Sequence, residues 1–145
     1  MEVNNLLIVV NSGPDKPYNH YASYVIAFMA KLQNGIENVT VFYGPQGVEM
    51  VQKGFLANLT IQPETKNLIA NQLGIDAAGI PDNLEQMARF LVDRGVVVAS
   101  CATFHVIRGF ATSTMDKTNI EDFVTPVKLP DAVGALLAAD RVHYL

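Results

Sequence analysis

The sequence predicts an α/β protein with three layers, α/β/α, built around a mostly parallel five-stranded sheet. Short apolar runs rich in β-branched residues recur along the 145-residue chain. Segments with the apolar period of an amphipathic helix lie between these runs, and turn residues separate the two kinds of segment. Alternating buried strands and amphipathic helices form a parallel sheet covered on both faces. Half of the residues are hydrophobic, so the chain is long enough to bury one core, and we expect a single domain over residues 1–145.

The first third of the chain contains two predicted strands. The run Leu6–Val10 is continuously apolar and ends at the turn residues 11–15. From His20 onward apolar residues recur with helical spacing, and Asn34-Gly35 ends that helix. The elements expected here are strands over 6–10 and 39–43, a helix over 20–32 and a short helix over 48–53.

Residues 55–80 have the least regular pattern of the chain. A helix over 64–73 is predicted because Pro63 precedes it and Gly74 follows it. The remainder lacks a sustained apolar period. We therefore interpret 55–80 as a loop-rich insertion within the single domain.

The second half begins with a predicted helix that starts at a capping box, Asp82–Glu85. The buried strand Val96–Ala99 follows, and a helix that begins at Ser100 or Cys101 ends at Gly109. Residues 112–121 are polar and irregular. The elements expected in this half are strands over 96–99, 123–129 and 141–145, and helices over 82–94, 100–109 and from Pro130 onward.

Cys101 is the only cysteine, and the pattern places it where a buried strand ends and a helix begins. Thiolates are stabilised at helix N-termini. At about 100° per residue, His105 and Arg108 share a narrow helical stripe with Cys101, and His105 is its i+4 neighbour. Two potential cations beside a thiol indicate a low-pKa nucleophile, with Cys101 and His105 as catalytic candidates. The alternative is that Cys101 is buried filler, as free cysteines often are, and that the other two residues are solvated.

The carboxyl ends of parallel strands lie at one edge of a sheet, where such folds bind their ligands. The loops at 11–15 and 43–47 and the start of the Cys101 helix meet at this edge in the predicted fold. We therefore take the polar residues of these segments as candidate substrate-binding residues: Ser12, Gly13, Tyr43, Ser100 and Arg108.

Composition and missing motifs narrow the function classes. The net charge is −4 and no Lys/Arg cluster occurs, so no nucleic-acid partner is expected. No apolar run has the length of a membrane span, and the N-terminal residues lack the features of a signal peptide. One cysteine cannot form an intrachain disulfide and favours a reducing compartment, so we expect a cytoplasmic protein. Glycine-rich phosphate loops, C-x-x-C pairs and metal-ligand spacings are absent, so neither a cofactor nor a metal is predicted.

The segment Val96–Cys101, followed after six intervening residues by Arg108-Gly109, resembles the DsrE/DsrF/TusD-like sulfur-relay family. The segments Leu6–Pro14, Asn38–Val48 and Ala139–Val142 are similar to that family too. The resemblance covers nearly the whole chain except about residues 55–80. The sequence departs from the family pattern after the cysteine, where the family has small residues and this chain has the bulky Thr103-Phe104-His105.

The resemblance implies a three-layer domain that assembles into homotrimers or homohexamers. It also implies that Cys101 accepts a sulfane sulfur as a persulfide and passes it to a cysteine of a partner protein. The expected partners are then a sulfur donor protein and a sulfur acceptor protein, with no cofactor. His105, on spacing alone, and Arg108 would stabilise the thiolate or an anionic donor.

Two other functions stay open at this stage. In the first, the chain is a non-catalytic oligomeric protein that binds a small ligand or regulates, and Cys101 is structural. In the second, Cys101 is a redox-sensing thiol that is oxidised to sulfenic acid. The rate at which the folded protein is alkylated distinguishes a relay cysteine from a structural one, and peroxide sensitivity identifies a sensor.

Overall fold

The computed structural model describes residues 2–145 and contains a five-stranded sheet in the order β4-β3-β2-β1-β5. Every neighbouring pair of strands is parallel, so the predicted fold class is confirmed and the sheet is parallel throughout. The strands β1 and β2 lie close to the predicted apolar runs. The five strands are β1 (Asn5–Val10), β2 (Asn38–Tyr43), β3 (Val97–Cys101), β4 (Thr125–Val127) and β5 (Arg141–Tyr144).

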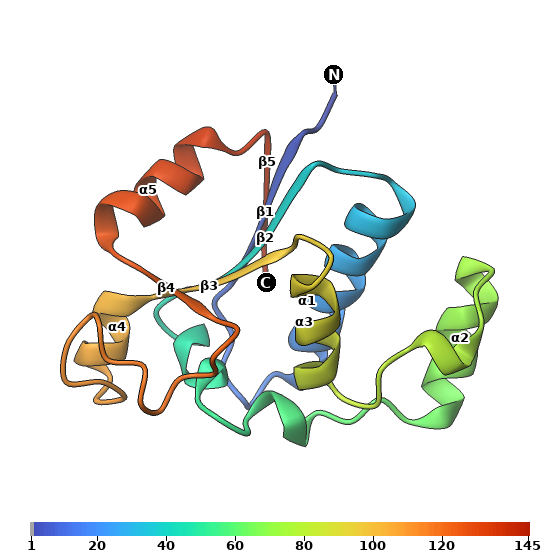
Figure 1. Ribbon diagram of the computed structural model, residues 1–145, viewed down its shortest axis with the longest axis horizontal. Coiled ribbons are helices and arrows are strands. Elements are labelled where there is room, and N and C mark those ends of the chain that lie inside the picture. The colour runs from blue at the N-terminus through green and yellow to red at the C-terminus, as the bar shows by residue number, and fades with distance from the viewer. Residues whose placement is uncertain (1) are drawn as a thin grey trace.

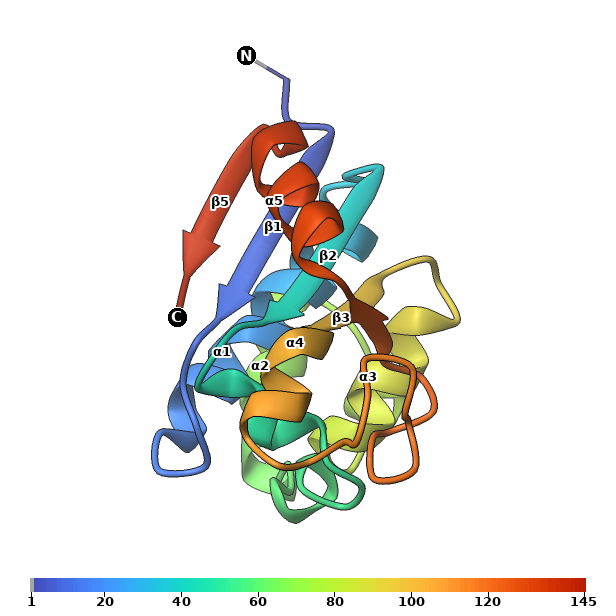
Figure 2. The same cartoon turned by 90° about the vertical axis from the view of Figure 1, so that its left-hand side faces the viewer.

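Helices cover both faces of the sheet and complete the three layers. The helices α1 (Pro17–Phe28) and α3 (Leu84–Val92) lie on one face, and α4 (Ala102–Ile107) and α5 (Leu129–Ala138) lie on the other (Figures 1 and 2). The helix α2 (Pro63–Leu73) lies outside the layer of α1 and α3 (Figure 1). Shorter turns are a π-helical turn (Met29–Gln33) and three 3₁₀ turns (Gly47–Val51, Leu56–Asn58 and Ala77–Gly79).

The main hydrophobic core lies between the sheet and the helices α1 and α3. Ile8, Val41 and Val98 are neighbours across three strands, and at most 1% of each is exposed. Side chains alternate between the two faces of a strand, so these three point to the same face. Tyr24 of α1 and Leu91 of α3 belong to the same cluster and are fully buried. We call this side of the sheet the α1/α3 face.

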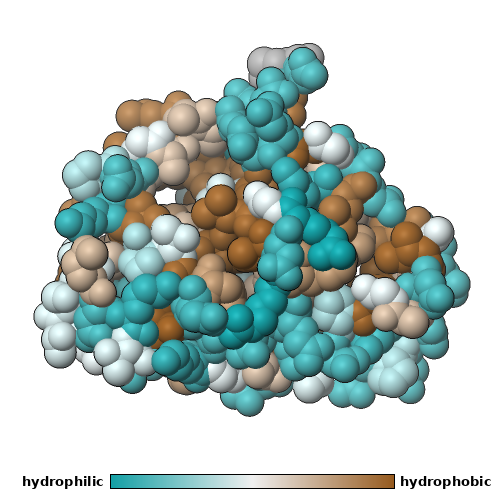
Figure 3. Space-filling model, viewed as in Figure 1, coloured by the Kyte–Doolittle hydropathy of each residue, from teal (hydrophilic) through white to brown (hydrophobic). Residues whose placement is uncertain are grey.

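The opposite side, the α4/α5 face, is covered more thinly. Its buried residues include Val9 and Ala99, which lie outside the main core cluster. In α5 only Ala132 is buried, whereas Leu137 is 82% exposed. Figure 3 shows the apolar surface over α5 and a hollow beside it. Further exposed apolar side chains on α5 are Leu129, Val133 and Leu136.

The helix boundaries differ from the predicted ones for local reasons. The first helix begins at Pro17, three residues early, because proline is well suited to a first helical turn. The capping box of α3 is shifted by one residue: the N-cap is Asn83, whose Oδ1 accepts the backbone N–H of Gln86 at 2.8 Å. The Gln86 side chain in turn accepts the N–H of Asp82 at 3.2 Å. The expected Asp82–Glu85 pair is therefore not the cap.

The strand expected over 123–129 shortens to the three residues of β4. It is an edge strand with Pro126 at its centre, and proline cannot donate a ladder hydrogen bond there. In the irregular segment before β4, Ile120 and Val124 pack into the main core. Within residues 2–145, no helix is both long and apolar enough to span a membrane.

Candidate functional site

Cys101 is the last residue of β3 and the N-cap residue of α4, with an extended backbone at φ −71° and ψ 104°. Its neighbour in the sheet is Val127 of β4. Alternation along β3 places its side chain with Ala99 on the α4/α5 face. Only 4% of the residue is exposed. The structure therefore places the thiol at the predicted edge of the sheet, but covered.

His105 is buried on α4 and pairs with Ser100, whose Oγ lies 2.6 Å from His105 Nε2. The expected contact with Cys101 assumed that residue 101 is helical. Since α4 begins only at Ala102, the four-residue helical spacing does not extend to Cys101. Ser100 and Cys101 are adjacent on a strand and point to opposite faces, so a histidine that pairs with Ser100 is directed away from the thiol side.

The Ser100–His105 pair is electrically neutral near pH 7. Burial lowers the pKa of His105 below its usual 6.5, because the charged imidazolium loses its hydration. The hydroxyl donates to an unprotonated Nε2, or a protonated Nε2 donates to Oγ, depending on the tautomer. The imidazolium expected beside the thiol is therefore not present at neutral pH. The pair instead joins the first turns of α4 to the end of β3.

Arg108 ends α4 and connects it to the loop that follows β2. Its Nη1 donates to the carbonyl oxygen of Pro45 at 2.9 Å, and its Nη2 lies 3.2 Å from Glu49 Oε2. The guanidinium also lies over the ring of Phe110, 5.3 Å from the centroid. Its positive charge is therefore already paired with a carboxylate. A second anion would have to compete with Glu49 for this guanidinium.

Ser12 and Gly13 lie in the loop after β1 and accept hydrogen bonds from side chains of α1. Ser12 Oγ accepts from Asn19 Nδ2 at 2.8 Å, and the Gly13 carbonyl accepts from His20 Nε2 at 2.8 Å. A Cβ at Gly13 would lie 3.6 Å from Glu49 Oε2. The structure therefore brings Gly13 and Arg108 together around Glu49, although the three residues come from different segments.

The loops after β1 and β2 are tied to each other beside an open cavity. Asn11 Oδ1 accepts the backbone N–H of Gln46 at 3.1 Å. A Cβ at Gly47 would lie 2.1 Å from the Val10 carbonyl oxygen, so only glycine allows the second loop to approach β1 this closely. The cavity has a volume of about 250 Å³ and is lined by Asn11, Ser12, Gly13, Asp15, Lys16 and Gln46.

Tyr43 belongs to the core and not to this cavity. Its hydroxyl lies 2.7 Å from the hydroxyl of Tyr24, and both residues are fully buried. Burial raises the pKa of Tyr43 well above its usual 10. Tyr43 is the neighbour of Ser100 across the sheet, on the α1/α3 face. The structure thus separates it from the cavity and from the face to which Cys101 points.

Two residues of the site were missed in the sequence. Glu49 pairs with Arg108, but the sequence contains no signal that links residues 59 positions apart. His20 is fully buried; its Nε2 must donate to the Gly13 carbonyl, which leaves Nδ1 as a buried acceptor without a protein partner. Burial lowers the pKa of His20. Within residues 2–145, no group of three or more His, Cys, Asp or Glu residues is arranged to hold a metal ion.

No protein-family model matches the sequence, and a comparison with curated protein sequences gives no match. Among solved structures, the crystal structure of the ychN protein from E. coli is similar to this chain, with a TM-score of 0.67 and 20% sequence identity. The similarity covers 98% of this chain and 99% of the ychN chain. The two proteins share a three-layer α/β/α fold over essentially their whole lengths.

Proposed function

We propose that this chain is a sulfur carrier, a sulfurtransferase in which Cys101 accepts a sulfane sulfur and passes it to a thiol of a partner protein. The observation that carries the proposal is the position of the lone thiol. It lies at the carboxyl end of β3, at the edge where the loops after β1 and β2 are tied together. The resemblance of the Val96–Gly109 segment to the DsrE/DsrF/TusD-like sulfur-relay family supports the same chemistry, and the chain has the three-layer fold that this resemblance implies.

The transfer is an exchange of one S–S bond for another and needs no cofactor. The Cys101 thiolate attacks the terminal sulfur of a donor persulfide; a new S–S bond forms at Sγ, and the donor's S–S bond breaks. The donor leaves as a thiolate with the electron pair of the broken bond. The acceptor thiolate then attacks the terminal sulfur on Cys101, which returns to a thiolate. From thiosulfate, the leaving group is sulfite.

The other residues of the site act by holding this segment in place. Ser100 and His105 fasten the start of α4 to β3, and Arg108 with Glu49 fastens its end to the loop after β2. An anionic donor group would enter through the cavity lined by Ser12 and Gly13 and displace Glu49 from Arg108. In this proposal Cys101 is the only residue that reacts.

Loading requires that Cys101, now 4% exposed, becomes accessible. The helix that follows Cys101, α4, has six residues, and only Ala102 and His105 of these are buried. Short helices with few buried side chains open at low free-energy cost. We therefore place the opening step in α4.

The burial of Cys101 favours a second candidate function. In this candidate the thiol is a core residue, and the chain is a non-catalytic oligomeric protein that binds a ligand or regulates. A structural cysteine reacts with alkylating reagents only when the protein unfolds. A relay cysteine reacts faster than global unfolding, because only α4 has to open.

We also propose that the chain assembles with copies of itself, as a homotrimer or homohexamer, through α5 and the edge strand β5. The exposed apolar side chains of α5 form one surface, and all four residues of β5 are exposed. Exposed apolar patches and open strand edges mark association sites. Replacing Leu137 with Asp should lower the mass measured by light scattering to that of smaller species, whereas Gln72→Asp on α2 should leave it unchanged. Wild-type protein that is monomeric at all concentrations would contradict the assembly.

The test of the carrier proposal is the intact mass of the native protein after incubation with polysulfide or thiosulfate. We expect a gain of roughly 32 Da per sulfur, which a thiol reductant removes. The Cys101→Ser variant, treated in parallel, should gain nothing. An unchanged mass, with alkylation no faster than unfolding, would reject the carrier and favour the structural cysteine. Stable oxidation by peroxide without any sulfur adduct would instead identify a redox sensor.

A further inference from the structure

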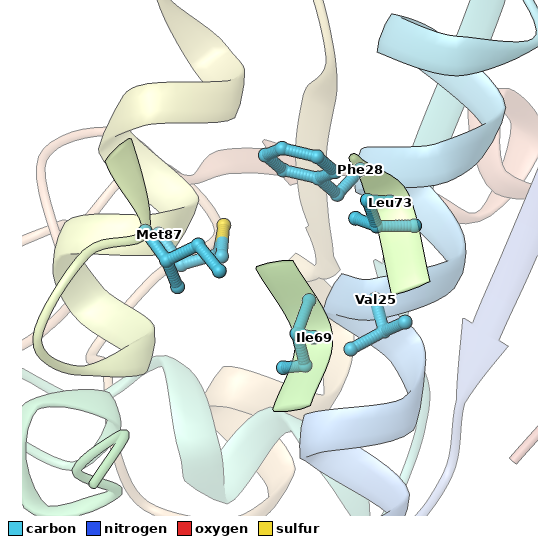
Figure 4. A pocket seen from close by; sticks show the side chains of 6 residues that line it. Val25, Phe28, Ile69, Leu73 and Met87 are labelled. Atoms are coloured by element: carbon cyan, nitrogen blue, oxygen red, sulfur yellow. The ribbon is translucent and has the colours of Figure 1, made fainter. Parts of the chain in front are cut away.

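A second candidate site lies on the far side of the sheet from Cys101, between α1 and α2. There the structure has an apolar cavity with a volume of about 510 Å³. This volume lies within the range of about 300–1,000 Å³ that is typical of small-molecule sites. Its inner end continues into a small apolar pocket that shares Val25, Ile69 and Met87 with it. Figure 4 shows this inner end, where side chains of α1, α2 and α3 converge.

The floor of the cavity is an apolar stripe on the outer side of α1. Tyr21, Ala22 and Val25 follow the i, i+1, i+4 spacing of one helix face and are only half-buried. The sheet-facing side of the same helix enters the main core through Ala27 and through Tyr24, which also reaches the cavity lining. The helix is therefore apolar on two sides, and its outer side needs a partner other than the sheet.

The helix α2 lies across the apolar stripe of α1 and leaves a space between the two helices. At one end, Tyr21 Oη donates to the Thr60 carbonyl at 2.7 Å; at the other end, Gln33 Nε2 donates to the Leu73 carbonyl at 3.2 Å. Between these ties, only Ala70 of α2 is buried. The segment before α2 is fixed as well, since the Ile61 N–H donates to the Asp82 carbonyl at 2.7 Å. Polar ties at both ends thus keep α2 at a distance from α1.

The lining specifies the charge of the occupant. Among residues 2–145, no Asp, Glu, Lys or Arg lines the cavity or its inner pocket, and burying a charge without a partner is costly. The polar side chains that line it lie toward its mouth, where Thr60, Gln62 and Thr65 are exposed. An occupant would place an apolar body against Val25, Ile69 and Met87 and a polar neutral group at the mouth.

We propose that this cavity binds an uncharged, predominantly apolar small molecule, and that α2 is the element that encloses it. This site is independent of the proposed sulfur chemistry. The lining residues come from α1, from the segment before α2, from α2 and from α3, whereas Cys101 points to the α4/α5 face. A ligand here would stabilise the attachment of α2 without touching the thiol.

The test uses two fluorescent probes that differ by one charged group. N-phenyl-1-naphthylamine is uncharged and apolar, and 8-anilino-1-naphthalenesulfonate has the same ring system with a sulfonate. We expect saturable binding of one uncharged probe per chain. The affinity of the sulfonate probe should be at least about tenfold lower, because the cavity offers no counter-charge.

Variants then locate the probe. Ala22→Phe fills the floor of the cavity, and Thr65→Phe blocks its mouth from an exposed position that tolerates substitution; each should weaken binding of the uncharged probe by about tenfold or more. The matched control is Gln72→Phe, which adds the same ring to α2 outside the lining. Leu137→Asp controls for probe bound to the apolar surface of α5 and should change nothing at the cavity.

Several outcomes would overturn the proposal. These are the absence of saturable binding, equal affinity for both probes, and binding that survives both Ala22→Phe and Thr65→Phe. A loss of oligomeric mass in these two variants would show that the groove is a contact between copies of the chain. The alkylation rate of Cys101 should be the same in all variants, so a failed carrier function and an empty cavity are distinguishable.

Discussion

The two faces of the sheet are formed by the same strands, but the helices that cover them bury very different amounts of apolar side chain. On the α1/α3 face, large side chains such as Tyr24 and Leu91 are fully buried against Ile8 and Val41. On the α4/α5 face, α5 contributes buried alanine and exposes its leucines. The difference suggests a division of roles. In our proposal the thickly covered face supplies stability, and the thinly covered face, which also carries Cys101, opens for sulfur transfer and associates with other copies of the chain.

The first prediction tests this division with two matched leucines. Leu91→Ala on α3 removes a fully buried side chain and should lower the free energy of unfolding by about 2–5 kcal/mol. Leu137→Ala on α5 removes one that is 82% exposed and should change it by less than about 0.5 kcal/mol in the isolated chain. Urea unfolding at low protein concentration measures both. Equal losses would mean that the two faces are equally packed.

The second prediction concerns the pair that fastens α4 to the sheet. His105→Ala leaves the buried Ser100 hydroxyl without its partner and should cost about 1–3 kcal/mol. His105→Gln, which keeps an amide within reach of Ser100, should recover part of the loss. Both variants should also speed alkylation of Cys101, because α4 opens more easily. If alkylation were unchanged while stability fell, α4 would not be the element that covers the thiol.

The third prediction separates the two possible roles of Arg108. Arg108→Ala breaks the partly exposed pair with Glu49 and should cost at most about 1 kcal/mol. If Arg108 fastens α4, the variant should be alkylated faster by iodoacetamide, which is uncharged. If it receives an anionic donor, loading from thiosulfate should become slower although alkylation becomes faster. Slower loading from neutral and anionic donors alike would rule out a role in anion binding.

The fourth prediction is the smallest and concerns pH. Burial lowers the folded-state pKa of both His20 and His105. As the pH falls, the two histidines therefore take up protons in the unfolded chain before they do so in the folded chain. The stability that comes from keeping them neutral is full above pH 6.5 and is lost as the pH falls below it. Glu121 acts oppositely: its raised pKa gives stability below about pH 4.5 that is lost as the pH rises. Urea unfolding between about pH 7.5 and about pH 5.5 should show a shallower loss in His105→Gln than in the wild type. If the stability of the variant and of the wild type fell equally with pH, the proton uptake that lowers stability would occur at a residue other than His105.

The sequence predicts the sheet well because strands buried on both faces leave a strong local pattern. The runs at Leu6–Val10 and Val39–Tyr43 correspond to β1 and β2 nearly to the residue. The position of Cys101 at the end of a strand is also visible in the sequence. These features depend on apolar patterns and turn residues, which are properties of neighbouring positions.

The arrangement of the site could not be predicted in the same way. The conformation of Cys101 determines which residue His105 contacts. Because Cys101 is extended and α4 starts at Ala102, His105 is positioned to pair with Ser100. The pairing of Arg108 with Glu49 and the burial of Tyr43 against Tyr24 depend on how separate segments pack. Boundary shifts of one or two residues are ordinary, but at a strand-to-helix junction they change which side chains meet.

The central claim, that Cys101 both accepts and releases a sulfane sulfur, is tested most directly by discharge of the loaded protein. Persulfidated chain, freed of donor, would be mixed with one equivalent of an acceptor thiol protein and followed by intact mass. The account predicts that the chain loses roughly 32 Da while the acceptor gains the same mass, with Cys101→Ser inert throughout. A chain that never loads, or that loads and releases sulfur only after unfolding, would contradict it.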